Sequence, residues 1–489
     1  MPTRKFTILH SNDMHGDFLA ESSGDSGELI GGLALLSGYI NKVRLEEENV
    51  LYVIAGDMLQ GSIIDTEYKG ISTMEIMNYL APDVVTLGNH EFDYGLPHLL
   101  FLEKMANFVI VNANLYIEKY NKRIMLPYKI IELADYNILF TGIITEKVMD
   151  SISTTDKLIS TFVTLKDAAE EVGRITNAYQ NDRINLTVLL THIGLESDLE
   201  LAGLLDPAWG VDMIIGGHSH SILDKPEEVN GVLITQAGEG TKQIGRFDII
   251  VEEATNSIVQ WKWQLVPISS RSAEEDKDLL NFIHSYKAEV IAKYKAIVTK
   301  LAFKHTHPAR EIETALGNLF ADGLAEMSDT EIMLLGSGSI RQKELGPLVT
   351  LRDFTTCFPF NDSLNRFTVT GAKLWQVFNH FMRPENRNGE GECYQVNGAV
   401  KATYSGAECK LLSLEINGQS VGFHEKYRIC ITGYHLKGSK AYLSLSEEEL
   451  REDGPFSIVS TSMTEVLQEW LQNNQNACRK VEGRLTYLP

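Results

Sequence analysis

Five short apolar runs in the first part of the chain each lead into a polar residue of a kind that binds metals. The runs span residues 6–10, 50–56, 83–88, 186–191 and 211–217. The polar residues that follow them, in order, are Asp13 and His15, Asp57, Asn89 and His90, His192, and His218 and His220. Short apolar runs bounded by polar or glycine-containing segments predict strands that are buried on both faces.

Helical patterns separate these predicted strands. Residues 32–45 follow the first motif, and residues 164–179 precede the fourth run. This alternation predicts β-α units stacked around sheets. Side chains just past the carboxyl ends of such strands share one crevice, so residues as distant in sequence as Asp13 and His220 can meet there.

The polar residues in question combine carboxylate, amide and imidazole groups. This ligand chemistry suits Mn²⁺, Zn²⁺, Fe or a similar divalent ion. A bridging carboxylate can hold two such ions about 3.5–4 Å apart, where they polarise phosphoryl oxygens and lower the pKa of a bound water. A nearby imidazole can then act as an acid or stabilise the transition state. The sequence therefore predicts two divalent metal ions as cofactors and a phosphorylated small molecule as the substrate.

The length of 489 residues exceeds the size at which a single hydrophobic core stops growing, so we expect two domains. Residues 272–298 mix charged and apolar groups at helical spacing and predict a linker helix, a natural place for a hinge. Beyond residue 305 the pattern changes to more strands and turns, and all five cysteines lie in this part. The predicted division is a metal-binding domain over 1–270, a linker over 271–304 and a substrate-binding domain over 305–489.

Charge and cysteine usage narrow the partners and the compartment. The net charge of −22 argues against nucleic acid or an anionic membrane surface as a partner, since both require a basic face. The apolar runs are too short to span a membrane, and no signal segment precedes the first strand. An odd number of scattered cysteines indicates no disulfide framework. We expect a cytoplasmic protein, with an exported form whose leader has been removed as the open alternative.

At these residues the chain resembles the calcineurin-like metallophosphoesterases, and in particular the two-domain 5′-nucleotidase family. The resemblance implies an N-terminal four-layer α/β/β/α domain and a C-terminal α+β substrate-binding domain. It also implies two ligand sets that share Asp57 as a bridge. These sets are Asp13, His15, Asp57 and His220 for one metal, and Asp57, Asn89, His192 and His218 for the other.

The segment Asn89-His90-Glu91-Phe92-Asp93 matches a signature of that family. By this resemblance His90 and Asp93 form a catalytic dyad. His90 is then expected to face the leaving group, while Asp93 orients the imidazole ring and fixes its tautomer.

The second half resembles the family's C-terminal domain over residues 300–480. Residues 310–319 match the segment that opens that domain, residues 336–341 its glycine-rich loop, and residues 358–361 its P-F segment. The resemblance implies that Arg310 and Arg341 bind the phosphate and ribose end of the substrate, a role that the forked donors of guanidinium suit. Phe360 and Tyr434 are then expected to stack on the base.

Two positions depart from the family pattern. Gly336 stands where relatives usually have Asn, which removes an amide that could read a base edge. Lys440 stands where the Asp that binds ribose hydroxyls is expected, and an ammonium group cannot accept those hydrogen bonds. The lysine is expected to favour an additional anionic group on the substrate.

The resulting prediction is a metal-dependent phosphohydrolase that acts on a nucleoside 5′-monophosphate or a related phosphorylated metabolite. One alternative is a 2′,3′-cyclic nucleotide phosphodiesterase or a nucleotide-sugar pyrophosphatase with the same metal centre. Another is a nucleotide-binding protein that has lost turnover. The intact Asp57, Asn89, His90 and Asp93 argue against this last alternative.

Overall fold

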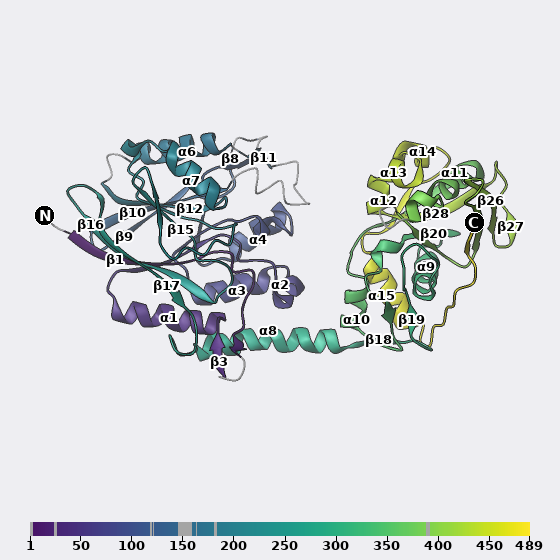
Figure 1. Cartoon of the computed structure of the whole chain (residues 1–489), viewed down its shortest axis with the longest axis horizontal. Coiled ribbons are helices and arrows are strands. Elements are labelled where there is room, and N and C mark those ends of the chain that lie inside the picture. The colour runs from purple at the N-terminus through teal and green to yellow at the C-terminus, as the bar shows by residue number, and fades with distance from the viewer. Residues whose placement is uncertain are drawn as a thin grey trace. The chain divides into compact units, whose positions relative to one another are not determined.

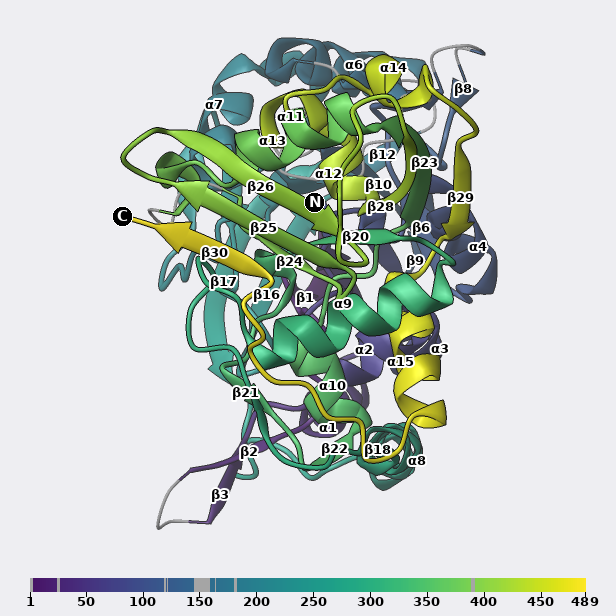
Figure 2. The ribbon, with the colours of Figure 1, turned by 90° about the vertical axis from the view of Figure 1, so that its right-hand side faces the viewer.

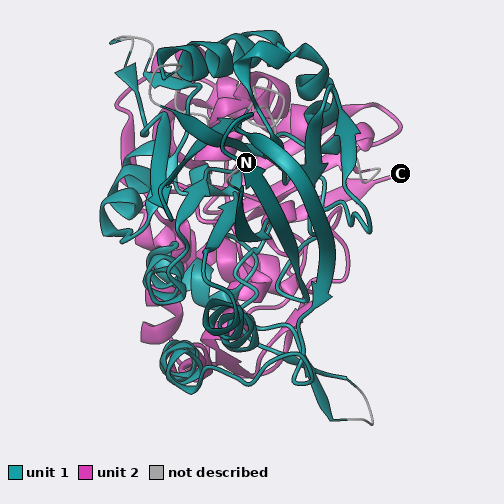
Figure 3. Cartoon of the chain, turned by 90° about the vertical axis from the view of Figure 1, so that its left-hand side faces the viewer, with its two compact units in different colours: residues 1–290 teal, residues 291–489 magenta. Residues whose placement is uncertain are grey.

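The computed structural model describes residues 3–23, 27–117, 120, 122–144, 159–162, 164–179, 183–387 and 392–489. The chain forms two compact units, residues 1–290 and residues 291–489, which Figure 3 shows in different colours. The division falls inside helix α8 (Lys277–Lys295), which lies within the stretch predicted to form a linker helix. The domain bounds at residues 270 and 305 stay a prediction.

Two six-stranded sheets form the centre of the first unit. The first sheet has the order β17 (Ser257–Pro267), β16 (Gln243–Glu252), β1 (Thr3–Ser11), β4 (Val50–Ala55), β5 (Val84–Thr86) and β6 (Val109–Val111). The second has the order β14 (Glu227–Val229), β15 (Val232–Thr235), β13 (Met213–Ile215), β12 (Ile184–His192), β10 (Tyr136–Ile144) and β9 (Tyr128–Leu133). The five strands predicted from the apolar runs are confirmed as β1, β4, β5, β12 and β13.

Helices cover the outer faces of both sheets, while side chains such as Ile8, Val53 and Phe140 fill the space between them. Helices α1 (Leu33–Glu46), α3 (Ile71–Leu80) and α8 pack on the first sheet, and α6 (Leu165–Ala178) and α7 (Leu195–Leu204) pack on the second. Figure 1 shows α6 and α7 on one side of the sheets and α1 and α8 on the other. The unit therefore has the four layers α/β/β/α that the resemblance implied.

Parallel pairing brings the ligand-bearing loops to a common edge of each sheet. In the first sheet β1 pairs in parallel with β4, and β4 pairs in parallel with β5. In the second sheet β12 pairs in parallel with β13. Because the carboxyl ends of neighbouring parallel strands lie side by side, the residues that follow these strands are placed together. The remaining elements of the unit are α2 (Ile63–Tyr68), α4 (Leu96–Met105), β2 (Glu21–Ser23), β3 (Glu28–Ile30), β7 (Leu115–Ile117), β8 (Lys122–Arg123) and β11 (Ile159–Phe162).

The second unit also contains two larger sheets. The five-stranded sheet has the order β24 (Tyr394–Val396), β20 (Ile332–Gly336), β28 (Lys426–Thr432), β23 (Leu364–Thr370) and β29 (Ser457–Ser460). The four-stranded sheet has the order β27 (Gln419–Ser420), β26 (Lys410–Ile416), β25 (Val400–Ser405) and β30 (Leu485–Leu488). Alternate residues of β20 enter different cores, Ile332 and Leu334 one and Met333 and Leu335 the other, as the two-residue period of a strand requires.

Each face of the five-stranded sheet has its own cover. Helices α9 (Ala315–Met327), α10 (Leu351–Cys357) and α15 (Met463–Asn473) pack on one face, and α11 (Gly371–Phe381) and the four-stranded sheet pack on the other. Figure 2 shows α9 beside α15, and β25, β26 and β30 side by side. This is the α+β architecture that the resemblance implied.

Short elements complete the second unit. They are β18 (Ile297–Lys300) paired with β22 (Leu348–Thr350), β19 (His305–Thr306) paired with β21 (Glu344–Leu345), and helices α12 (Gly433–Lys437), α13 (Ser439–Leu443) and α14 (Glu447–Arg451). Within the described part of the chain, no helix combines the length and the apolar composition that crossing a bilayer requires.

The two sheets of the first unit come into close contact at Gly142 in β10. A methyl group at this position would overlap Thr86 Oγ1 and the carbonyl oxygen of Val111, which belong to the other sheet. Gly142→Ala should therefore lower the free energy of unfolding by about 1–3 kcal/mol, the usual cost of overpacking a core. Thermal or urea unfolding of the purified protein measures this change.

Gly203→Ala is the matched control for that substitution. Gly203 lies in helix α7, and a methyl group there meets nothing within 4 Å. Because alanine is the better helix former, this variant should gain about 0.5–1 kcal/mol. Equal stability of the two variants would contradict the tight contact between the sheets.

Candidate active site

Five of the predicted metal ligands have a backbone conformation that residues other than glycine rarely adopt. The φ angles of Asp13, His15, Asp57, His218 and His220 are 51°, 48°, 54°, 79° and 51°. Such a conformation costs about 1–3 kcal/mol per residue and is concentrated at functional sites. The loops after β1, β4 and β13 therefore store strain at the positions where their side chains converge.

The ligand atoms of these loops lie close together. Three groups have all their ligand atoms within 4.8 Å of one another, namely Asp13, His15 and His220; His15, Asp57 and His90; and Asp57, His192 and His218. Asn89 lies in the same place, because its Oδ1 is 3.2 Å from His192 Nε2 and 3.0 Å from His218 Nδ1. Asp57 belongs to two of the groups, as a bridging carboxylate would. The structure thus gathers all seven residues that were predicted to bind metal.

The surrounding hydrogen bonds turn imidazole lone pairs toward the centre. His192 Nδ1 lies 2.9 Å from the carbonyl oxygen of Ala55, so Nδ1 carries a proton and donates it. In a neutral ring His192 Nε2 is then an acceptor, and it lies 3.1 Å from Asp57 Oδ2. Two acceptors at this distance repel each other unless a cation or an added proton lies between them.

His15 and His220 show the same arrangement. Their Nε2 atoms are 3.2 Å apart. Their Nδ1 atoms lie beside acceptors, the Leu59 carbonyl oxygen at 3.4 Å and the Glu239 carboxylate at 2.6 Å. Both Nδ1 atoms are therefore placed to donate, which leaves two lone pairs facing each other. Separations of about 3 Å are those of neighbouring ligands around one ion whose bonds are about 2.1 Å long, so the donor set fits divalent metals.

The charge of the centre favours a cation as well. Burial lowers the pKa of His192, but the Asp57 carboxylate outweighs this effect and raises the pKa to about 10. Burial raises the pKa of Asp57, yet the His192 imidazole holds it well below its usual range. A field that keeps a proton on a fully buried imidazole would equally stabilise a divalent ion in its place.

His90 and Asp93 form a hydrogen-bonded pair beside the centre. His90 Nδ1 lies 2.7 Å from Asp93 Oδ2, and this hydrogen bond raises the pKa of His90 while burial opposes it. The same oxygen accepts a hydrogen bond from Gln60 Nε2 at 2.9 Å, a contact that the sequence did not predict. The backbone N–H of His90 donates to Asp57 Oδ1 at 2.9 Å, which ties the pair to the metal-binding loop.

Glu91 is the main residue of this site that sequence reasoning missed. It is buried, and its carboxylate accepts hydrogen bonds from the backbone N–H groups of Gly88, Asp57, Met58 and Leu59 at 2.6–3.3 Å. Burial and the neighbouring Asp57 carboxylate raise the pKa of Glu91 to about 7. Glu91 therefore clamps the loop after β4 to the loop after β5. Its place directly after His90 in the signature is the one sequence signal that could have suggested a role.

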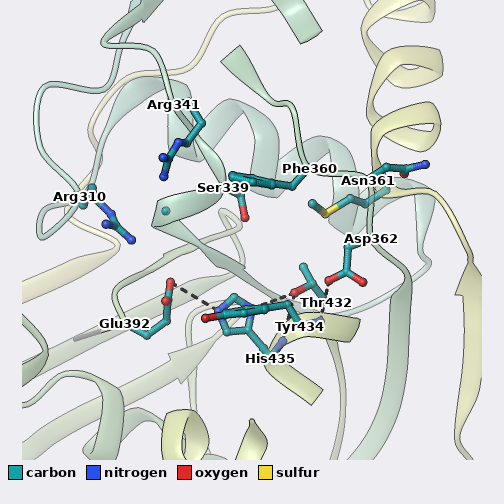
Figure 4. A pocket seen from close by; sticks show the side chains of 12 residues that line it. Arg310, Ser339, Arg341, Phe360, Asn361, Asp362, Glu392, Thr432, Tyr434 and His435 are labelled. Atoms are coloured by element: carbon teal, nitrogen blue, oxygen red, sulfur yellow. Dashed lines mark hydrogen bonds and ion pairs between the residues drawn. The ribbon is translucent and has the colours of Figure 1, made fainter. Parts of the chain in front are cut away.

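A pocket of about 410 Å³ in the second unit contains all four residues that were predicted to bind substrate. Figure 4 shows the rings of Phe360 and Tyr434 on opposite sides of this pocket, with Arg310 and Arg341 at one end. The two aromatic residues are 48% and 57% exposed, and the Arg341 guanidinium lies 5.4 Å from the centre of the Phe360 ring. Exposed rings and converging cations around a cavity suit a flat, anionic ligand.

The two departures from the family pattern have structural explanations. A methyl group at Gly336 would overlap His435 Cε1 and lie 2.9 Å from Glu392 Oε1, so the neighbouring histidine excludes an Asn at this position. Lys440 pairs with Glu449 at 2.9 Å and is not among the residues that line the pocket. The expectation that Lys440 favours an additional anionic group on the substrate stays a prediction.

Comparison with known proteins agrees with this geometry. The family model described as calcineurin-like phosphoesterase matches residues 6–221, and the model described as 5′-nucleotidase, C-terminal domain, matches residues 290–447. Together the two matches span most of both compact units. They therefore cover the metal centre as well as most of the residues that line the pocket.

Individual relatives share this two-part organisation. A snake venom 5′-nucleotidase from Gloydius brevicauda is 28% identical over 450 residues, which cover 82% of this chain and 74% of that protein. A 5′-nucleotidase from Vibrio vulnificus is 25% identical to this chain, and the match covers 96% of this chain and 91% of that protein. The crystal structure of a 5′-nucleotidase precursor from Thermus thermophilus has the same fold, with a TM-score of 0.57 at 23% identity over 99% of each chain. With both of its units matched in this order, the chain belongs to the two-domain 5′-nucleotidase family and is a metal-dependent phosphoesterase.

Proposed function

We propose that this protein hydrolyses the phosphate ester of a nucleoside 5′-monophosphate, using two divalent metal ions in the first unit. The observation that carries the proposal is the convergence of seven ligand side chains around Asp57. The pocket with two exposed rings and two arginines supports a nucleotide as the substrate. The relatives that are named as 5′-nucleotidases support the same substrate class.

The ligands divide into two sets that share Asp57. The first set is Asp13, His15, Asp57 and His220, and the second is Asp57, Asn89, His192 and His218. When bound, the two ions supply Lewis-acid stabilisation of the phosphoryl oxygens and a water of lowered pKa.

Neighbouring groups already orient one of these ligands. The Asp13 carboxylate accepts hydrogen bonds from Asn12 Nδ2 at 2.7 Å and from the His218 backbone N–H at 2.9 Å. Such contacts fix the direction of a ligand before the metal binds, which improves the geometry of the centre.

His90 acts on the leaving group in this proposal. Asp93 holds the Nδ1 side of the ring, so Nε2 is the nitrogen that faces the substrate. Water supplies the oxygen that joins phosphorus, the bond from phosphorus to the ester oxygen breaks, and His90 Nε2 delivers a proton to that oxygen. The products are inorganic phosphate and a nucleoside with a free hydroxyl group.

The second unit selects the substrate. Arg310 and Arg341 bind the phosphate and ribose end by charge-assisted hydrogen bonds. Phe360 and Tyr434 stack on the two faces of the base. Their common position around one pocket supports these roles.

Hydrolysis of a phosphodiester or pyrophosphate is the second candidate function. Relatives named as a trifunctional nucleotide phosphoesterase from Bacillus subtilis and as an apyrase from Tabanus yao also match this chain, at 26% and 25% identity. The departures at Gly336 and Lys440 lie in the part of the chain that selects substrate, which leaves this candidate open to a direct test.

Asp57→Asn should abolish turnover and lower the metal content from two ions per chain toward one or none, because a neutral amide bridges two cations poorly. Elemental analysis of the dialysed protein and an assay of released phosphate measure the two effects. Asp135→Asn is the matched control, since Asp135 is exposed and has a similar φ of 66°. Two tightly bound metals and normal turnover in the Asp57 variant would show that Asp57 is not the bridge.

His90→Ala should leave both metals in place and lower kcat by about 10²–10⁴-fold, the usual contribution of a positioned acid-base group. Asp93→Asn should have a smaller effect in the same direction, because it disturbs only the orientation of the ring. His284→Ala, an exposed position on α8, serves as the control. An unchanged kcat in the His90 variant would remove His90 from the mechanism.

Among nucleoside mono-, di- and cyclic phosphates, nucleotide sugars and p-nitrophenyl phosphate, the metal-loaded chain should have its highest kcat/KM for a nucleoside 5′-monophosphate. Arg341→Ala should raise KM for that nucleotide by about tenfold or more, the effect of losing a hydrogen bond to a charged group. The KM for p-nitrophenyl phosphate should change little, because this ester lacks the nucleoside that the pocket holds.

Arg352→Ala on α10 is the control for Arg341→Ala, since Arg352 is exposed and does not line the pocket. A highest kcat/KM for a cyclic nucleotide or a nucleotide sugar would favour the second candidate function. Equal losses of nucleotide and p-nitrophenyl phosphate turnover in the Arg341 variant would remove Arg341 from substrate selection.

A further inference from the structure

The pocket of the second unit contains a carboxylate to which no role has been given. Glu392 lines the pocket just before β24, and its side chain is only 14% exposed. Its Oε1 lies 3.5 Å from His435 Nε2, as Figure 4 shows. A carboxylate that is largely removed from water requires donors to offset the loss of hydration.

His435 is placed to orient that carboxylate. The His435 ring is buried, and its Nδ1 lies 2.9 Å from Thr432 Oγ1. The Thr432 oxygen also caps α12 by accepting from the His435 backbone N–H, so its hydroxyl proton is available to His435 Nδ1. His435 Nε2 then carries the other proton and lies 3.5 Å from Glu392 Oε1, an ion-pair distance, without a hydrogen bond in the part of the chain that the structure describes.

Gly336 belongs to the same packing unit. A side chain at this position would overlap the His435 ring and approach Glu392 Oε1. Gly336 therefore leaves the space that the Glu392–His435 pair occupies, and a side-chain amide at position 336 would exclude this pair. The polar group that the glycine-rich loop lacks is supplied here from the segment that precedes β24.

The position of Glu392 in the pocket indicates which part of a ligand it meets. Figure 4 shows Glu392 on the same side of Tyr434 as Arg310 and Arg341, with Asp362 on the opposite side. A carboxylate near the arginines would repel the phosphate itself, so it must face an uncharged part of the ligand that carries donors. Between a phosphate at the arginines and a base between the rings lies the sugar.

Asp362, the other carboxylate among the described residues that line the pocket, is already engaged. Its Oδ1 accepts from the Ser363 backbone N–H at 2.7 Å, and its Oδ2 accepts from the Tyr434 backbone N–H at 2.6 Å. Asp362 therefore holds the loop beneath Tyr434. Of the two carboxylates among the described lining residues, Glu392 is therefore the one that can accept hydrogen bonds from a ligand.

We propose that Glu392, positioned by His435, accepts hydrogen bonds from the vicinal hydroxyl groups of the substrate's ribose and makes the protein selective for ribonucleotides. This inference rests on the proposed function, in which the pocket binds a nucleoside 5′-monophosphate. Glu392 would thus supply the hydrogen-bond acceptor that Lys440 cannot provide, and it comes from a different segment of the chain.

The test compares adenosine 5′-monophosphate with its 2′,3′-dideoxy analogue as substrates of the metal-loaded full chain. The wild-type protein should prefer the ribonucleotide in kcat/KM by about 10- to 100-fold, the range for hydrogen bonds to a charged group. Glu392→Ala should reduce this preference to within about threefold, mainly by raising KM for the ribonucleotide. Glu392→Gln keeps one acceptor oxygen and should retain part of the preference.

Two further variants separate binding from packing. His435→Phe keeps a ring in the buried site but removes the donor, so it should weaken the ribose preference less than Glu392→Ala does. Glu408→Ala, which changes an exposed acid that does not line the pocket, should keep the full preference.

The failures of the inference and of the proposed function give different results. A full ribose preference that persists in Glu392→Ala and Glu392→Gln would overturn the role of Glu392 alone. If the wild-type protein hydrolyses neither nucleotide better than p-nitrophenyl phosphate, the proposed function is wrong and this inference is overturned with it.

Discussion

The convergence of carboxylate and imidazole groups on one small region is the constraint around which the candidate site of the first unit is arranged. His15 and His220 approach each other through Nε2, and His192 Nε2 lies against the Asp57 carboxylate. The outer nitrogens of these rings are occupied by carbonyl and carboxylate oxygens, so the rings cannot turn away without losing those bonds. Divalent ions would supply the positive charge between these groups, and the strained backbone at Asp57 and its counterparts holds the side chains in that arrangement.

The strain persists because the surrounding structure holds the loops in place. Glu91 accepts four backbone hydrogen bonds from the loops after β4 and β5 and so links Asp57, the bridging ligand of the proposed centre, to the segment that carries His90. The His90 backbone donates back to Asp57. A displacement of either loop would move both the proposed metal ligands and the His90–Asp93 pair, so in the proposed function the binding of metal is coupled to the geometry of the reaction.

In the proposed function the second unit has a separate task, the recognition of the substrate. Its pocket lies within one compact unit and combines rings, guanidinium groups and a carboxylate, each suited to a different part of a nucleotide. In that proposal the metal centre requires only a phosphate ester, whereas the pocket distinguishes one ester from another. The departures from the family pattern at Gly336 and Lys440 lie in the second unit. The first unit keeps the carboxylate, amide and imidazole groups that the family pattern implies for the metal centre.

The sequence by itself determined the five strands, the order of the polar motifs that follow them and the residue types that meet at their carboxyl ends. These features depend on local periodicity and on the general rule that neighbouring parallel strands end at one edge. Only the tertiary structure decided the backbone contacts of Glu91, the position of Glu392 beside His435 and the pairing of Lys440 with Glu449. Glu91 bonds to a backbone group 34 positions away, and Lys440 pairs with Glu449 of a separate helix. Tertiary packing determines such partners, and the pattern of side chains along the sequence does not specify them.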